Sequence, residues 1–246
     1  MLKAHDIVKL WEVASGKPTW QKAILILAAS SPNEPMENLA LQSLGMRNVR
    51  LFRLRDKLFG TNLSANTSCM ECGEAVEFQL DSQVICNPEL APIESAEINL
   101  EIDEYSVLCR PVNSYDLRDV MPIMEIEGIE GAEAELVHRC TFRLSRDGVM
   151  IPVESLSPEV LGKVAEGIKD ADIHSEILCR LNCPECSHTW PEPFDIAKFL
   201  WQELELKAKI ILSEVQLLAK AFGWWEGDIL SLSDVRRKYY LEALNA

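Results

Sequence analysis

The sequence predicts an α+β protein that is mostly helical, with a small β subdomain interrupted by a long insertion. Apolar residues recur at helical spacing near both ends of the chain, and they alternate along several segments in the middle. Two Cys-x-x-Cys pairs, Cys69/Cys72 and Cys183/Cys186, lie far apart, with residues 73–182 between them. A chain of 246 residues is long enough to bury a sizeable core around these elements.

Residues 1–62 are expected to form a helical unit. An amphipathic helix is predicted over residues 2–14. A second helix, "TWQKAILILAAS", ends at "SSPNEP", because proline and asparagine disfavour helix there. A short helix in "MENLALQSL" and a longer one in "NVRLFRLRDKLFG" follow, and Gly60 suits the C-cap of the latter.

Residues 63–110 and 176–195 are expected to form a zinc-ribbon-like β subdomain. The apolar residues of "GEAVEFQL" fall on one side of a strand. "AEINLEI" and "YSVLCR" also alternate, and the Asp-Glu pair between them can turn a hairpin. "EILCRLN" alternates as well, so it is expected to run as a strand into the second cysteine pair.

The insertion itself, residues 111–175, is expected to be mainly helical. Ser114 can cap "YDLRDVM", and "GAEAELVHRC" is a second predicted helix. The Asp-Gly pair in "SRDGVMI" predicts a turn. Ser157 at the N-cap and Pro158 at the first helical position start another helix, "SPEVLGKVAEGI".

Residues 196–246 are expected to be C-terminal helices. Asp195 can cap a long helix from Ile196 to Phe222, which carries apolar residues at near-heptad spacing and ends at Gly223. Ser233 can cap the last helix, "DVRRKYYLEAL".

Cys69, Cys72, Cys183 and Cys186 together predict one structural Zn2+ site. Four thiolates satisfy a tetrahedral zinc ion, and a two-residue spacer lets both sulfurs of one knuckle reach the same ion. Zinc would fasten the two ends of the insertion and offset the entropy cost of closing so long a loop. Catalysis at this metal is not expected, because four thiolates leave no open position for water.

Two other interpretations of the cysteine pairs stay open. His188 could replace a cysteine as a ligand, or the pairs could be redox dithiols, although two pairs favour a metal. The remaining cysteines show no ligand spacing and are expected to pack as small hydrophobic residues. These are Cys86, Cys109, Cys140 and Cys179.

Composition disfavours several classes of function. The net charge of −15 repels phosphate, so neither nucleic acid nor an anionic membrane is expected as a partner. No apolar run is long enough for membrane insertion, and the N-terminus does not resemble an export signal. We find no phosphate loop, nucleophile elbow or Ser/His/Asp set. We therefore expect a cytoplasmic, non-enzymatic protein without a small-molecule substrate.

The C-terminal segment "AFGWWEGDILSLSDVRRKYYLEAL" is a candidate protein–protein interface. Trp, Tyr and Arg are enriched at interface hot spots. An equally weighted alternative is that one Trp and one Tyr pack in the core while the arginines lie in solvent. The interface candidates are Trp224, Trp225, Arg236, Arg237 and Tyr240.

The segments "LWEVASGKPTWQKAILILAASSP", "LRDKLFG", "CMECGEAVEF", "CPECSHTWPEPFDIAKFLWQELE" and "LAKAFGWWEGDILSLSDVRRKYYLEAL" span most of the chain. Together they resemble the baseplate proteins of contractile phage tails and phage-tail-like injection systems, including the T-even hub and assembly proteins. The resemblance implies a structural baseplate component that binds other baseplate, hub or spike subunits and becomes part of the particle. A transient assembly chaperone and a zinc-ribbon regulatory or nucleic-acid-binding protein are the alternatives.

Overall fold

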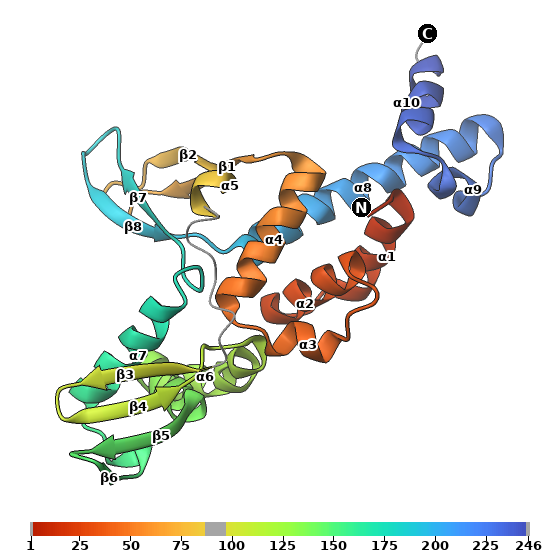
Figure 1. The fold of residues 1–246 in the computed structure, drawn as a ribbon. Coiled ribbons are helices and arrows are strands. Elements are labelled where there is room, and N and C mark those ends of the chain that lie inside the picture. Colours follow the sequence, from red (N-terminus) through yellow and green to blue (C-terminus); the bar gives the residue numbers. More distant parts are fainter. Residues whose placement is uncertain (1, 87–96, 245–246) are drawn as a thin grey trace.

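The structure is a computed structural model that describes residues 2–86 and 97–244 (Figure 1). Helices dominate, and the strands form three small antiparallel sheets within the described residues, which confirms the α+β fold class. Helices near the two ends of the chain lie together, and the insertion projects from them as a separate layer (Figure 1). None of the helices described in these ranges is both long and apolar enough to cross a bilayer.

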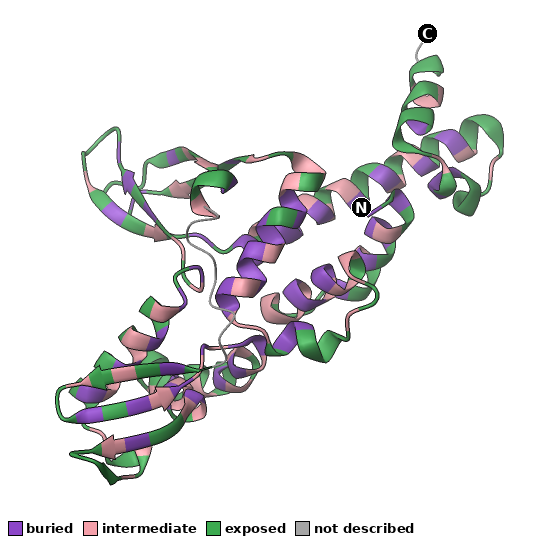
Figure 2. Ribbon diagram, in the orientation of Figure 1, coloured by how far each residue is buried: buried purple, intermediate pink, exposed green. Residues whose placement is uncertain are grey.

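The main core lies between helices from both ends of the chain. Their apolar faces form one buried cluster, and Figure 2 shows this burial along α2 and α4. The helices are α1 (Ala4–Ala14), α2 (Thr19–Ser30), α3 (Met36–Leu41), α4 (Leu44–Phe59) and α8 (Ile196–Phe222). α4 starts earlier than expected, because the Ser43 hydroxyl accepts a hydrogen bond from the Met46 N–H at 3.1 Å. Gly60 is its C-cap, as predicted, with φ of 91°.

Two β-hairpins carry the cysteine pairs in their turns. The first pairs β1 (Asn62–Ser68) with β2 (Ala75–Asp81), and the second pairs β7 (Leu178–Asn182) with β8 (Thr189–Pro193). The short helix α5 (Ser82–Ile85) follows β2. The sequence did not predict β1, because "NLSANTS" is polar and becomes a strand only by pairing with β2.

The insertion has its own sheet and its own core. Its strands lie in the order β3 (Ile98–Ile102), β4 (Tyr105–Cys109), β5 (Thr141–Arg146) and β6 (Val149–Met150). We expected β3 and β4 to belong to the zinc-ribbon-like subdomain, but they lie in one sheet with β5 and β6, in which β4 pairs with β5. Val107 and Leu144 on this sheet pack in one buried cluster with Val164 and Ile168 of α7 (Pro158–Ala171). The residue Ala96, at the expected start of β3, lies outside the described ranges.

The connections in the insertion follow the predicted turns. The Asp147-Gly148 pair turns β5 into β6, with both residues at positive φ. A short 3-10 turn, η2 (Val153–Ser155), precedes α7, and the Ser157 hydroxyl caps α7 by accepting from the Val160 N–H at 3.4 Å.

Helix α6 (Ser114–Cys140) folds back on itself at Gly128. Gly128 has φ of 77° and ψ of −167°, which interrupts the helix and suits only glycine. Arg139 Nε donates to Asp116 Oδ1 at 3.2 Å, although these residues would be about 35 Å apart along a straight helix. α6 is therefore a helical hairpin. Its N-cap is Asn113 and not Ser114, because the Asn113 amide oxygen accepts hydrogen bonds from the Tyr115 and Asp116 N–H groups.

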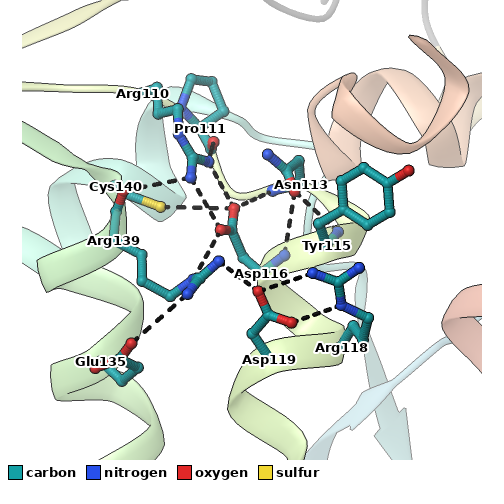
Figure 3. A network of polar contacts seen from close by, with 10 residues as sticks. All are labelled: Arg110, Pro111, Asn113, Tyr115, Asp116, Arg118, Asp119, Glu135, Arg139 and Cys140. Atoms are coloured by element: carbon teal, nitrogen blue, oxygen red, sulfur yellow. Dashed lines mark hydrogen bonds and ion pairs between the residues drawn. The ribbon is translucent and has the colours of Figure 1, made fainter. Parts of the chain in front are cut away.

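A buried aspartate holds this helical hairpin closed (Figure 3). Asp116 is 1% exposed and accepts two hydrogen bonds from Arg110, at 2.6 and 2.9 Å. Arg139 bridges Asp116 and Asp119, which lie on the other half of α6. Burial opposes ionisation of Asp116, but the arginines and the Asn113 N–H outweigh it and lower the pKa of this carboxyl.

Two short helices follow α8 in the part of the chain that the structure describes. Asp195 caps α8, as predicted, and Gly223 ends it with φ of 67° in the left-handed region. α9 (Glu226–Ser231) and α10 (Asp234–Ala243) follow, and the Ser233 hydroxyl caps α10.

Candidate metal centre

The four predicted cysteines come together at the tips of the two hairpins. Their sulfur atoms all lie within 4.8 Å of one another. Two close contacts cross between the knuckles: the Cys69 and Cys186 sulfurs are 3.6 Å apart, and the Cys72 and Cys183 sulfurs are 3.5 Å apart. All four thiols are free, since a disulfide would bring two sulfurs to about 2 Å.

The two knuckles have the same backbone hydrogen bonds. In the first, the Cys69 N–H donates to Glu74 O at 2.8 Å, and the Gly73 N–H donates to Cys69 O at 2.9 Å. In the second, the Cys183 N–H donates to His188 O at 2.8 Å, and the Ser187 N–H donates to Cys183 O at 3.0 Å. The sequences "CMECGE" and "CPECSH" therefore fold into matching turns.

Each knuckle turn needs a residue at positive φ directly after its second cysteine. Gly73 has φ of 76° and adopts this conformation without strain. Ser187 has φ of 61°, which is uncommon for a residue with a side chain. The small residues after each cysteine pair therefore serve the turn geometry that brings the sulfurs together.

The cluster can hold one metal ion. A tetrahedral ion bound by sulfur at about 2.3 Å keeps its ligands about 3.8 Å apart, close to the separations found here. Cys69 and Cys183 are buried and Cys72 and Cys186 are exposed, so the site lies at the surface with two ligands facing inward.

The pKa values of two of the cluster's thiols, one in each knuckle, shift in opposite directions. The N–H groups of Cys186 and Glu185 point at the Cys183 sulfur and lower the pKa of that thiol to about 7. At Cys72 the backbone of Glu74 also favours the thiolate, but desolvation and the neighbouring sulfurs prevail and raise its pKa to about 12. Ionisation of all four thiols so close together would therefore require a positive charge among them.

His188 lies beside the cluster but is not part of the sulfur set. Its ring stacks on Trp190, with centroids 5.6 Å apart, and Trp190 is buried. Trp190 Nε1 donates to Glu192 at 2.8 Å, which fixes the indole. In the part of the chain that the structure describes, the group able to hold a metal ion is formed by cysteines alone.

The two hairpins continue into the two longest core helices of the main body. β1 follows α4, and β8 leads into α8. Arg55 of α4 joins these helices: its guanidinium binds Glu203 of α8 at 3.0 and 2.7 Å and donates to Asn62 O at 2.8 Å. A metal ion held by the four cysteines would therefore add a second link between segments that Arg55 already connects.

The insertion is tied to the start of α4 by buried polar groups that the sequence analysis did not identify. The Asp172 carboxylate accepts from the Gly45 N–H at 2.8 Å, and the Asn48 amide donates to His174 O at 2.8 Å. The Leu44 N–H donates to Val112 O at 2.9 Å. Both ends of the insertion thus meet one helix terminus, and no local sequence signal pairs residues so far apart.

The other cysteines pack as predicted for small apolar residues. Cys109, Cys140 and Cys179 are buried, and Cys86 is half-buried. Burial raises the pKa of Cys140 to about 12, so this thiol stays protonated near neutral pH.

The C-terminal interface candidates fall into two groups. Trp225 is 82% exposed, and Arg236 is also exposed. Trp224 instead packs against Tyr240, with ring centroids 4.9 Å apart. Arg237 is 2% exposed and binds Glu214 and Asp234, so its side chain is used within the chain and is not available to a partner.

Comparison with known proteins gives no relative. No protein-family model, curated protein or solved structure matches this chain.

Proposed function

We propose that this protein is a non-enzymatic scaffold that binds neighbouring subunits and is stabilised by one zinc ion on Cys69, Cys72, Cys183 and Cys186. The position of the sulfur cluster carries this proposal. It joins the hairpin that follows α4 to the hairpin that precedes α8. Four thiolates complete the coordination of a tetrahedral ion, so the metal would stabilise the fold and leave no position for a substrate water.

Metal analysis of the purified protein tests the zinc assignment. Four-sulfur sites of tetrahedral shape hold zinc or iron. One zinc per chain, lost together with thermal stability when a chelator is added, is the expected result. Iron in place of zinc, or a metal-free protein of unchanged stability, contradicts the assignment.

We further propose that the neighbouring subunits are baseplate, hub or spike proteins of a contractile phage-tail-like particle assembled in the cytoplasm. The support is the sequence resemblance, which includes both knuckles and the C-terminal segment. The exposed Trp225 and Arg236 add residue types that are frequent at protein interfaces. The net charge of −15 disfavours the alternative of a nucleic-acid-binding zinc ribbon.

Mass spectrometry of purified particles tests this assignment. A structural component is present at a fixed ratio to the other baseplate subunits in mature particles. An assembly chaperone is present in cells that build particles and is absent from mature ones. Absence from both the particles and their assembly intermediates contradicts the baseplate proposal.

A further inference from the structure

We propose that the tip of the α6 hairpin and the groove beside it form a docking surface for a basic amphipathic helix of a partner protein. The α6 tip is defined here as residues 121–133, on both sides of the turn at Gly128. The inference goes beyond the proposed function and does not depend on the particle in which the protein works, because it uses only the insertion.

The α6 tip exposes large apolar side chains to solvent. Ile126 is 83% exposed, Ile129 is 78% exposed and Met124 is 51% exposed. Residues 124–130 are all exposed, although they include three large apolar side chains. Burying such side chains against a partner removes apolar surface from water and favours binding. A cluster of them at one turn is typical of an interaction site.

The same tip carries unbalanced negative charge. Residues 120–134 contain Glu125, Glu127, Glu130 and Glu133 and no lysine, arginine or histidine. The nearest arginine on the second half of α6, Arg139, already binds Asp116 and Asp119. Like charges three or four residues apart on a helix repel one another, and cations from a partner would relieve this repulsion.

A groove lies directly beside the tip. It has a volume of about 430 Å³ and is lined by both halves of α6 and by residues 153–161. Carboxylates of Glu127, Glu135 and Glu154 lie at the groove, and Glu154 binds His138 at 2.8 Å. The apolar lining is formed by Ile123, Ala134, Val153, Leu156 and Leu161. A groove lined by both apolar and acidic side chains fits a segment that has one apolar face and basic residues beside it.

Charge complementarity selects the partner. A second copy of this chain has a net charge of −15 and would be repelled, as would an anionic membrane. A helix with apolar residues at every third or fourth position can lay that apolar face into a groove. Lysines or arginines beside this face can then form ion pairs with the glutamates of the tip and the groove. The tip therefore favours a basic amphipathic helix over the other occupants.

Binding of synthetic peptides to the full-length protein tests the proposal. The probe is a short peptide of leucine and lysine, with leucines spaced so that they share one face of a helix. The control peptide has the same sequence with glutamate in place of every lysine. We expect the lysine peptide to bind at least about tenfold tighter than the glutamate peptide, with an affinity that falls as salt is added. Fluorescence anisotropy of labelled peptides measures both affinities.

Three variants locate the site. The double variant Ile126→Ser/Ile129→Ser removes two exposed apolar side chains of the α6 tip. The triple variant Glu125→Gln/Glu127→Gln/Glu130→Gln removes three of its negative charges. We expect each variant to bind the lysine peptide about tenfold more weakly than wild type. Glu12→Gln/Glu37→Gln/Glu166→Gln makes the same charge change on other exposed surfaces, and it should leave the affinity within about twofold of wild type.

Several results would overturn the proposal. One is equal binding of the two peptides, and another is an equal loss of affinity in the control variant, which would indicate binding to overall charge. A third is a wild-type protein that binds neither peptide but self-associates, and that no longer self-associates when it carries Ile126→Ser/Ile129→Ser. That result would make a second copy of the chain the partner of the α6 tip. Circular dichroism of each variant verifies folding, since all substituted residues are exposed.

Discussion

The Asp172 carboxylate accepts a hydrogen bond from the Gly45 N–H at 2.8 Å and so links the end of α7 to the first turn of α4. There is no space for a side chain at this contact, because a Cβ on Gly45 would lie 1.9 Å from Asp172 Oδ1. We expect Gly45→Ala to lower the free energy of unfolding by about 1–3 kcal/mol through overpacking. Urea unfolding measures the change.

Gly162→Ala is the matched control for that substitution. Gly162 lies inside α7, and a Cβ there meets no atom within 4 Å. Alanine should therefore stabilise the protein by up to about 1 kcal/mol, because it favours helix over glycine. If both variants were stabilised alike, the Asp172 contact would not restrict residue 45.

Metal binding should depend on Cys183, in the turn after β7, and not on Cys179, within β7 itself. We expect Cys183→Ala to lose bound metal and to lower the melting temperature, because metal binding contributes directly to folding. Cys179→Ala, at a buried position outside the sulfur set, should keep full metal content. Elemental analysis and calorimetry of both proteins make the comparison. Full metal content in Cys183→Ala would rule out the four-sulfur site.

The site was predictable from sequence because both halves of it are local motifs. Two Cys-x-x-Cys pairs, each followed by a small residue, predict two knuckles, and the structure places Gly73 and Ser187 at positive φ as that turn requires. Helix limits set by local signals were predictable too: α2 has the predicted limits, and Gly60 and Gly223 end their helices as expected.

Long-range pairing was not predictable from the sequence. β3 and β4 form the predicted hairpin, but nothing in their alternation shows that β5 is their neighbour. The fold-back of α6 at Gly128 depends on Arg139 meeting Asp116, a contact between residues that no periodicity relates. Arg237 looked like a surface residue because its partner Glu214 lies on another helix.

Asp116 should make the insertion sensitive to acid. The folded protein lowers the pKa of this carboxyl, so it stabilises the fold above its ordinary pKa of about 4, and that contribution is lost as pH falls through the lowered value. Asp116→Asn should cost about 2–4 kcal/mol at neutral pH, less than a fully buried pair because Arg110 and Arg139 are partly exposed.

Unfolding measured between neutral pH and about pH 3 checks both parts of this prediction. The difference between wild type and Asp116→Asn should shrink as the pH falls, because protonation removes the charge that the substitution removes. Asp119→Asn, at a more exposed carboxylate, should cost no more than about 1 kcal/mol. A constant difference across the pH range would show that Asp116 acts only through its shape.

Arg237 should anchor α10 to α8. Its guanidinium is buried and binds Glu214 of α8 at 2.5 Å. We expect Arg237→Ala to lower the local opening free energy of α10 by about 2 kcal/mol, because it leaves Glu214 without its partner. Hydrogen exchange of the α10 amides measures this. Arg236→Ala, which changes an exposed neighbour, should leave the exchange as in wild type.

Substitutions of the two adjacent tryptophans should have different effects: Trp224→Ala should lower stability, and Trp225→Ala should affect only partner binding. Trp224 stacks on Phe222 at 4.8 Å and lies edge-on to Tyr240, so Trp224→Ala should cost about 1–3 kcal/mol of stability. Trp225 is 82% exposed, so Trp225→Ala should leave the melting temperature unchanged. If the C-terminal helices bind other baseplate subunits, Trp225→Ala should still reduce incorporation into particles.

Incorporation is compared at equal amounts of folded protein, so that loss of stability in Trp224→Ala does not count as loss of binding. Val235→Ser changes another exposed apolar side chain, 81% exposed, on the same C-terminal segment. A reduction with Trp225→Ala alone assigns a specific contact to the indole, whereas reduction with both variants indicates a broader apolar surface. Normal incorporation of both variants would remove the C-terminal helices from the interface and leave the α6 tip as the remaining candidate.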